Sequence, residues 1–89
     1  MSTRVVNLRR ESYDVYIGRP SMVGNPFPIT QSCTRNMSVR KYREWFDARI
    51  RQDAAFRSFV LSLRGKRLGC FCKPDVCHGD VIVEWLENN

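Results

Sequence analysis

The sequence turns from a strand into a helix within one stretch, KRLGCFCKPDVCHGDV at residues 66–81. The run Lys66–Cys72 predicts a strand, because small or apolar residues recur at every second position. Pro74 ends this strand, since proline lacks the backbone N–H that a sheet needs. A closing helix is expected next, with Gly79 in its first turn. Its apolar stripe consists of Val81, Ile82, Trp85 and Leu86.

Two more strands are expected near the N-terminus. Arg4–Leu8 and Asp14–Gly18 are short runs rich in β-branched residues. With the strand at Lys66–Cys72 they make a sheet of about three strands, which we expect to be parallel because a long helical span separates the second from the third. A chain of 89 residues has room for one domain, over residues 1–89. The predicted fold class is a small α/β domain with a kinked or paired central helix and a C-terminal helix.

The central helical span is predicted from its spacing. Apolar residues recur at steps of three and four between Val39 and Leu63, and we interpret them as core. Ser38 is the expected N-cap of this helix. Asp53 has the character of a second N-cap, so the span is either one kinked helix or two helices. Gly65 marks its end.

Charge and hydropathy narrow the classes of function. No apolar run approaches the ~20 residues that cross a membrane, and the N-terminus lacks the apolar segment of an export signal. We therefore expect a cytoplasmic protein with no membrane partner. The net charge is +6, and most basic groups lie in residues 35–67, whereas residues 74–89 are acidic. This distribution fits either a solvated helix surface or an anionic partner, such as a nucleotide, a nucleic acid or an acidic protein.

Three cysteines and the single histidine cluster in the loop between the last strand and the closing helix. Without an export signal, such a cluster indicates metal binding or reactivity more than disulfides. Cys70, Cys72, Cys77 and His78 have the number and types of ligands of a closed zinc site, although their spacing is tighter than usual. Alternatively, Cys77 or Cys72 is a reactive thiolate, with His78 as its base and Asp80 nearby. A third reading takes the cysteines as small buried residues and the histidine as a residue that orients a ligand-binding loop.

A second unusual loop follows the strand at Asp14–Gly18. It reads RPSMVGNPFP at residues 19–28, and its three prolines keep it stiff. Loops that follow neighbouring parallel strands leave the sheet at the same edge. We therefore expect Arg19 and His78 to belong to one site although they lie far apart in the sequence.

Four motifs carry a resemblance to a known family. They are Val15–Ser21, Gly24–Phe27, Leu63–Pro74 and Cys77–Val81, and they span nearly the whole chain. The chain thereby resembles an uncharacterised phage and bacterial family, catalogued as domain of unknown function 4326. It departs from the family's usual pattern at Val23 and Phe71, where the family often has tryptophan, and both positions stay apolar.

The ending of the cysteine loop is also similar to a second uncharacterised family, whose pattern reads Cys-x-Glu…Cys-His-Arg. That similarity implies a Rossmann-like relative. Neither resemblance names a reaction. The first implies a phage-encoded protein, which would act in the host cytoplasm.

The leading hypothesis is a site for a small anionic, nucleotide-like ligand where the two loops meet. Arg19 would hold a phosphate, and Ser21 and Asn25 would form hydrogen bonds with the ligand. The amides near Gly79, at a helix N-terminus, would bind an anion. Cysteine chemistry at this site and simple sequestration of the ligand both stay open. The alternatives are a zinc-stabilised module that binds nucleic acid through residues 35–67 and a module that binds a host protein.

Overall fold

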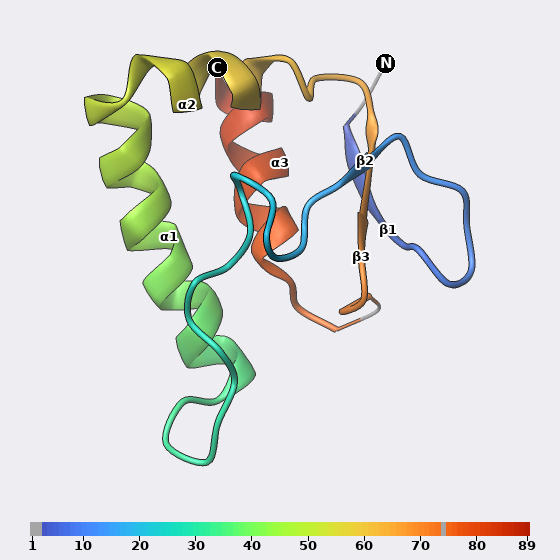
Figure 1. Cartoon of the computed structure of the whole chain (residues 1–89), viewed down its shortest axis with the longest axis vertical. Helices are drawn as coiled ribbons and strands as arrows, with labels where there is room; N and C mark the ends of the chain where they lie inside the picture. The colour runs from blue at the N-terminus through green and yellow to red at the C-terminus, as the bar shows by residue number, and fades with distance from the viewer. Residues whose placement is uncertain (1–2, 74) are drawn as a thin grey trace.

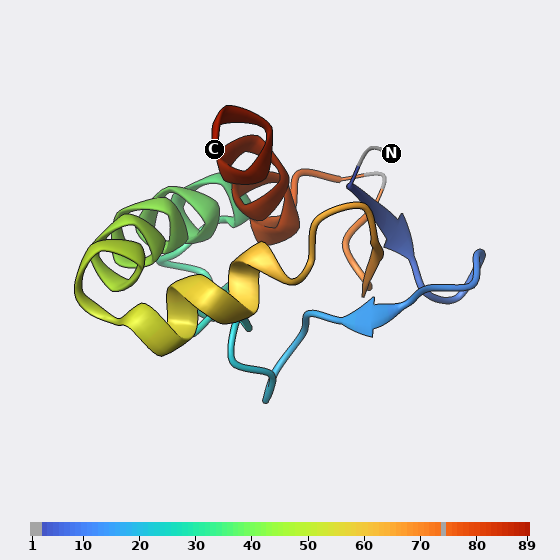
Figure 2. The same cartoon turned by 90° about the horizontal axis from the view of Figure 1, so that it is seen from above.

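The computed structural model describes residues 3–73 and 75–89, which form a sheet with three helices on one side of it (Figure 1 and Figure 2). The strands are β1 (Arg4–Asn7), β2 (Val15–Tyr16) and β3 (Arg67–Cys70). β3 lies in the middle and pairs in parallel with both neighbours, in the order β1-β3-β2. The predicted α/β domain with three parallel strands is confirmed. Its Rossmann-like character stays a prediction.

The strands are shorter than the sequence indicates. β2 has two residues, and the chain folds back after it. The Tyr16 hydroxyl donates a hydrogen bond across this turn to the carbonyl of Arg19 (2.9 Å). The ladder extends one step further, since the N–H of Ile17 donates to the carbonyl of Gly69 (3.1 Å). β3 ends at Cys70, two residues before the predicted end. Pro74, which was expected to end it, lies outside the described residues.

The central span consists of two helices, α1 (Arg35–Gln52) and α2 (Ala54–Leu61). The predicted break at Asp53 is confirmed. Its carboxylate accepts hydrogen bonds from the N–H of Phe56 (3.1 Å) and from the guanidinium of Arg49 (3.0 Å). It thereby caps α2 and pairs with the last turn of α1. Gly65, past the end of α2, has a φ of 79°, a conformation that favours glycine.

The predicted N-cap of the first helix, Ser38, is wrong. The cap is Thr34, whose hydroxyl accepts a hydrogen bond from the N–H of Met37 (3.3 Å). The polar residues before Ser38 suggest a loop, yet they form the first exposed turn of the helix. Ser38 itself is buried, and its hydroxyl donates to the carbonyl of Phe27 in the preceding loop.

Aromatic rings fill the space between the helices and the sheet. Tyr42 and Phe46 of α1 and Phe56 of α2 have no exposed surface, and the rings of Phe46 and Phe56 meet edge to face at 5.6 Å. The interpretation of the apolar stripes as core is confirmed. The third helix, α3 (His78–Asn88), packs on α1, α2 and β1. None of the helices in the described part of the chain is both long and apolar enough to span a membrane.

Candidate functional site

A cavity of about 520 Å³ opens at the carboxyl ends of β2 and β3. Its walls come from the loop after β2, the loop after β3 and the first turns of α1 and α3. They include both Arg19 and His78, so the two loops meet at one edge of the sheet, as the parallel order predicts. The lining residues are Tyr16, Gly18, Arg19, Asn25, Phe27, Pro28, Ile29, Ser38, Cys70, Phe71, Cys72 and His78.

His78 is held in one orientation at the base of this cavity. Its Nε2 lies 2.8 Å from the carbonyl oxygen of Ile17, to which it donates, and its ring meets the edge of the Tyr42 ring at 5.1 Å. Burial lowers the pKa of His78, and the nearby charge of Arg19 lowers it further. The imidazole is therefore neutral at pH 7, with Nδ1 free of a proton. That nitrogen lies 3.6 Å from the sulfur of Cys77.

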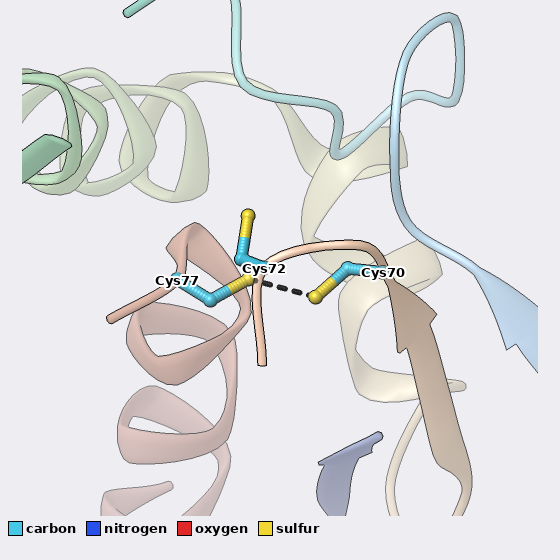
Figure 3. Close-up of side chains that lie close together, drawn as sticks. All are labelled: Cys70, Cys72 and Cys77. Carbon is cyan, nitrogen blue, oxygen red and sulfur yellow. Dashed lines mark hydrogen bonds between the residues drawn. The ribbon is translucent and has the colours of Figure 1, made fainter. Parts of the chain in front are cut away.

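The three cysteines of the second loop converge. Their sulfur atoms all lie within 4.8 Å of one another. Cys70 comes from the end of β3, Cys72 from the loop and Cys77 from the N-cap of α3. Figure 3 shows the sulfurs of Cys70 and Cys77, 3.0 Å apart, pointing at one another. This group could hold a metal ion, and among the described residues it does not include His78, the fourth ligand that the sequence suggested.

The thiols of this group differ in acidity. A hydrogen bond from the Cys77 thiol, helped by the backbone N–H groups of Cys72 and Lys73, lowers the pKa of Cys70 to about 6. The same hydrogen bond, together with burial, raises the pKa of Cys77 above its usual range. Cys77 is also fully buried and does not line the cavity, whereas Cys70 and Cys72 do. The acidic thiol that meets the cavity is thus Cys70, which the sequence did not single out as a nucleophile.

Asp80, placed by the sequence beside a catalytic pair, acts in the structure as part of a helix cap. Its carboxylate accepts from the backbone N–H of Cys77 (3.1 Å) and from the ammonium of Lys73 (2.6 Å). The Cys77 sulfur in turn accepts from backbone N–H groups of the first turn, which completes a capping box. Asp80 does not line the cavity.

Of the three other residues predicted to bind the ligand, only Asn25 lines the cavity. Its Nδ2 donates to the hydroxyl of Ser38 (2.8 Å) and its Oδ1 accepts from the N–H of Phe27 (2.9 Å), so both ends of the amide hold the loop. The Ser21 hydroxyl is buried and has no partner among the described residues. Gly79 is buried in packing, because a Cβ there would lie 2.7 Å from the side chain of Ile17.

Arg19 remains the cation of the cavity wall. It is exposed and forms no ion pair within residues 3–73 and 75–89. Several arginines of the basic middle segment are engaged instead with the protein. The ion pairs of these arginines are Arg35–Asp75, Arg43–Glu84 and Arg49–Asp53.

The comparisons with known proteins agree with the motifs. The family described as "Domain of unknown function (DUF4326)" matches residues 2–88. The chain belongs to this family. It is also 37% identical over 80 residues to the "Uncharacterized 12.4 kDa protein in nrdA-td intergenic region" of Enterobacteria phage T4, an alignment that covers 90% of this chain and 73% of the phage protein. No solved structure matches the chain.

Both loops of the cavity fall within the region that matches the family, yet sequence reasoning missed part of the wall. Tyr16 and Phe71 form an edge-to-face pair with ring centres 6.3 Å apart, and Phe27 also lines the cavity. Because side chains alternate along a strand, Phe71 was expected on the face opposite to Cys70. This alternation was the signal that could have placed Phe71 in the cavity wall. Ser38 carried no such signal, because its position depends on how the loop after β2 packs on α1.

Proposed function

We propose that the cavity binds a small anionic ligand of the nucleotide type. The observation that carries this proposal is the combination of Arg19 with aromatic rings in one cavity of about 520 Å³. This volume lies within the range of pockets that enclose small ligands. A guanidinium pairs with phosphate through two parallel hydrogen bonds, and the faces of aromatic rings accept planar bases.

The aromatic contribution comes from Tyr16, Phe27 and Phe71. Phe71 is 53% exposed and lines the cavity, so its ring is accessible to a ligand there. The guanidinium of Arg9 lies 5.1 Å from the centre of the Phe71 ring and adds a second positive charge near the cavity. We assign the base to the Phe71 side and the phosphate to Arg19. Binding alone supports sequestration of the ligand as well as a reaction on it.

The test is a calorimetric titration with adenosine 5′-monophosphate, inorganic phosphate and adenosine. We expect the monophosphate to bind more tightly than either part alone. Arg19→Gln should weaken its binding about ten- to hundredfold, the loss expected for one charge-assisted hydrogen-bonding group. Arg51→Gln is the matched control, because Arg51 is exposed at the end of α1 and does not line the cavity. Equal affinities of the two variants, or no binding of any nucleoside monophosphate tested, would contradict the proposal.

We further propose that the group of Cys70, Cys72 and Cys77 holds zinc. Zinc binds thiolates at about 2.3 Å in a tetrahedral arrangement, which separates the sulfur atoms by about 3.8 Å. The three sulfur atoms lie within 4.8 Å of one another, so small side-chain movements would bring them to this separation. Elemental analysis should find one equivalent of zinc in the purified protein and in Cys33→Ser, a variant outside the group. Purified protein that contains no zinc and takes up none when zinc is added would contradict this assignment.

A further inference from the structure

We infer that a metal ion held by Cys70, Cys72 and Cys77 keeps one coordination position open toward the cavity, where a phosphate oxygen of the ligand completes the coordination. This inference rests on the proposed function of the cavity and on the proposed metal. It makes the cysteines part of the ligand site, whereas the sequence suggested a closed structural site.

The number of protein ligands supports an open position. Within residues 3–73 and 75–89, the group of close metal-ligating side chains stops at the three cysteines. The nearest acidic side chain in the sequence, Asp75, pairs with Arg35 (3.9 Å), and Asp80 is engaged by Lys73 (2.6 Å). Zinc sites with three protein ligands leave the fourth position to water or substrate.

His78 is the residue that could close the site, and its distance from the group argues against this. Its Nε2 donates to the carbonyl of Ile17, and this contact seats the ring against α1 and the loop after β2. Nδ1 lies near the sulfur of Cys77 (3.6 Å), but the ring does not join the group that includes Cys70 and Cys72. Ligating histidines commonly donate their other ring N–H to a backbone carbonyl, so this hydrogen bond is compatible with either site. A closed site would require the ring to move until Nδ1 approaches all three sulfur atoms.

The direction of the open position follows from the burial of the three thiols. Cys77 lies behind the other two with no exposed surface, while Cys70 and Cys72 line the cavity. An ion among the three sulfur atoms is thus covered by protein on the Cys77 side and borders the cavity on the other. Arg19 lines the same cavity. Three thiolates outweigh the charge of a divalent ion, so an oxyanion that coordinates this ion depends on the guanidinium of Arg19 to offset its charge.

The experiment uses the full chain loaded with Co²⁺, whose visible absorption reports its ligands. Inorganic phosphate, adenosine 5′-monophosphate and imidazole are added separately. We expect all three to shift the Co²⁺ bands of the wild-type protein. In Arg19→Gln, the phosphate shift should need at least about tenfold more phosphate, a change of roughly 1.4 kcal/mol. The imidazole shift should persist unchanged, because imidazole carries no charge for Arg19 to bind. Cys33→Ser is the control for thiol content.

The outcomes separate this inference from the proposed function. Calorimetric binding of the nucleotide without any shift of the Co²⁺ bands would leave the function standing and overturn the open position. A shift with imidazole but no binding of any nucleotide would support the open position and overturn the function. Bands that no added ligand shifts, but that change in His78→Gln, would show a closed site with histidine as the fourth ligand. Failure of the protein to bind Co²⁺ would overturn the inference outright.

Discussion

The three helices and the cavity edge, residues 17–34 and 71–78, bury different kinds of groups. Between the helices the buried side chains are mainly aromatic and aliphatic, for example those of Phe46, Phe56 and Leu86. Besides Ile17 and Val23, the cavity edge buries polar and sulfur-containing groups, namely the imidazole of His78, the hydroxyl of Ser21 and the thiols of Cys33 and Cys77. Buried polar groups stabilise a fold only when they are hydrogen-bonded, and apolar groups do so by leaving water. We therefore expect the helices to supply most of the stability, and the edge to contribute less.

The largest effect should come from breaking the helical side. Phe46→Ala removes a fully buried ring that contacts Phe56 at 5.6 Å and Trp85 at 6.3 Å. We expect a loss of about 3–5 kcal/mol in the free energy of unfolding, measured by urea denaturation. Phe71→Ala, the same change on an exposed ring of the cavity edge, should cost less than about 1 kcal/mol. Equal losses in the two variants would abolish the distinction between the two regions.

Gly79→Ala tests how closely the start of α3 is packed against the sheet. Helix propensity alone predicts a gain of about 1 kcal/mol. A Cβ at this position would lie 2.7 Å from side-chain atoms of Ile17 and of Val5, both closer than van der Waals contact allows. We expect overpacking to prevail and to cost about 1–3 kcal/mol in urea denaturation. Ser58→Ala, exposed on α2, is the propensity control, and a gain in both variants would show that α3 can shift freely.

Ser38→Ala tests the connection between the two regions. The hydroxyl of Ser38 donates to the carbonyl of Phe27 and accepts from Asn25. Its loss leaves both partners without this bond, so we expect a cost of about 1–2 kcal/mol by urea denaturation. Hydrogen exchange should also become faster in residues 25–29 while the amides of α2 keep their protection. A uniform acceleration across the chain would mean that the edge and the helices unfold as one unit.

The smallest effect is expected at the exposed pair of Asp14 and Arg67. Hydrogen bonds from the side chain and the backbone N–H of Arg67 lower the pKa of Asp14 below its ordinary value of 3.8. The pair's contribution to stability is therefore present above pH 4 and is lost as the pH falls through the lowered pKa of the folded state. Urea midpoints should show Asp14→Asn slightly less stable than the wild type at pH 7, with the difference shrinking as the pH falls below 3.8 and through the lowered pKa of the folded carboxyl. The matched control is Asp47→Asn, because Asp47 is exposed on α1 and has no ion pair among the described residues.

The local pattern predicted the elements well and their ends less well. The break at Asp53 and the turn at Gly65 follow from capping and backbone preferences that act within a few residues. The cap at Ser38 was predicted by the same rule and is wrong. Its hydroxyl donates a hydrogen bond to the loop after β2, and Thr34 caps the helix instead. Asp80 shows the reverse case, where a residue assigned to chemistry serves as part of a helix cap.

The sequence by itself determined the three strands, a break in the central helical span near Asp53 and the meeting of two loops, since periodicity, capping and parallel order are local or topological properties. Only the tertiary structure decided the partners of the polar groups at the edge. It turned His78 toward the carbonyl of Ile17, brought Cys72 to the Cys70–Cys77 pair and packed Gly79 against the sheet. Contacts of this kind depend on the distances between side chains from separate elements, and no spacing along one chain encodes those distances.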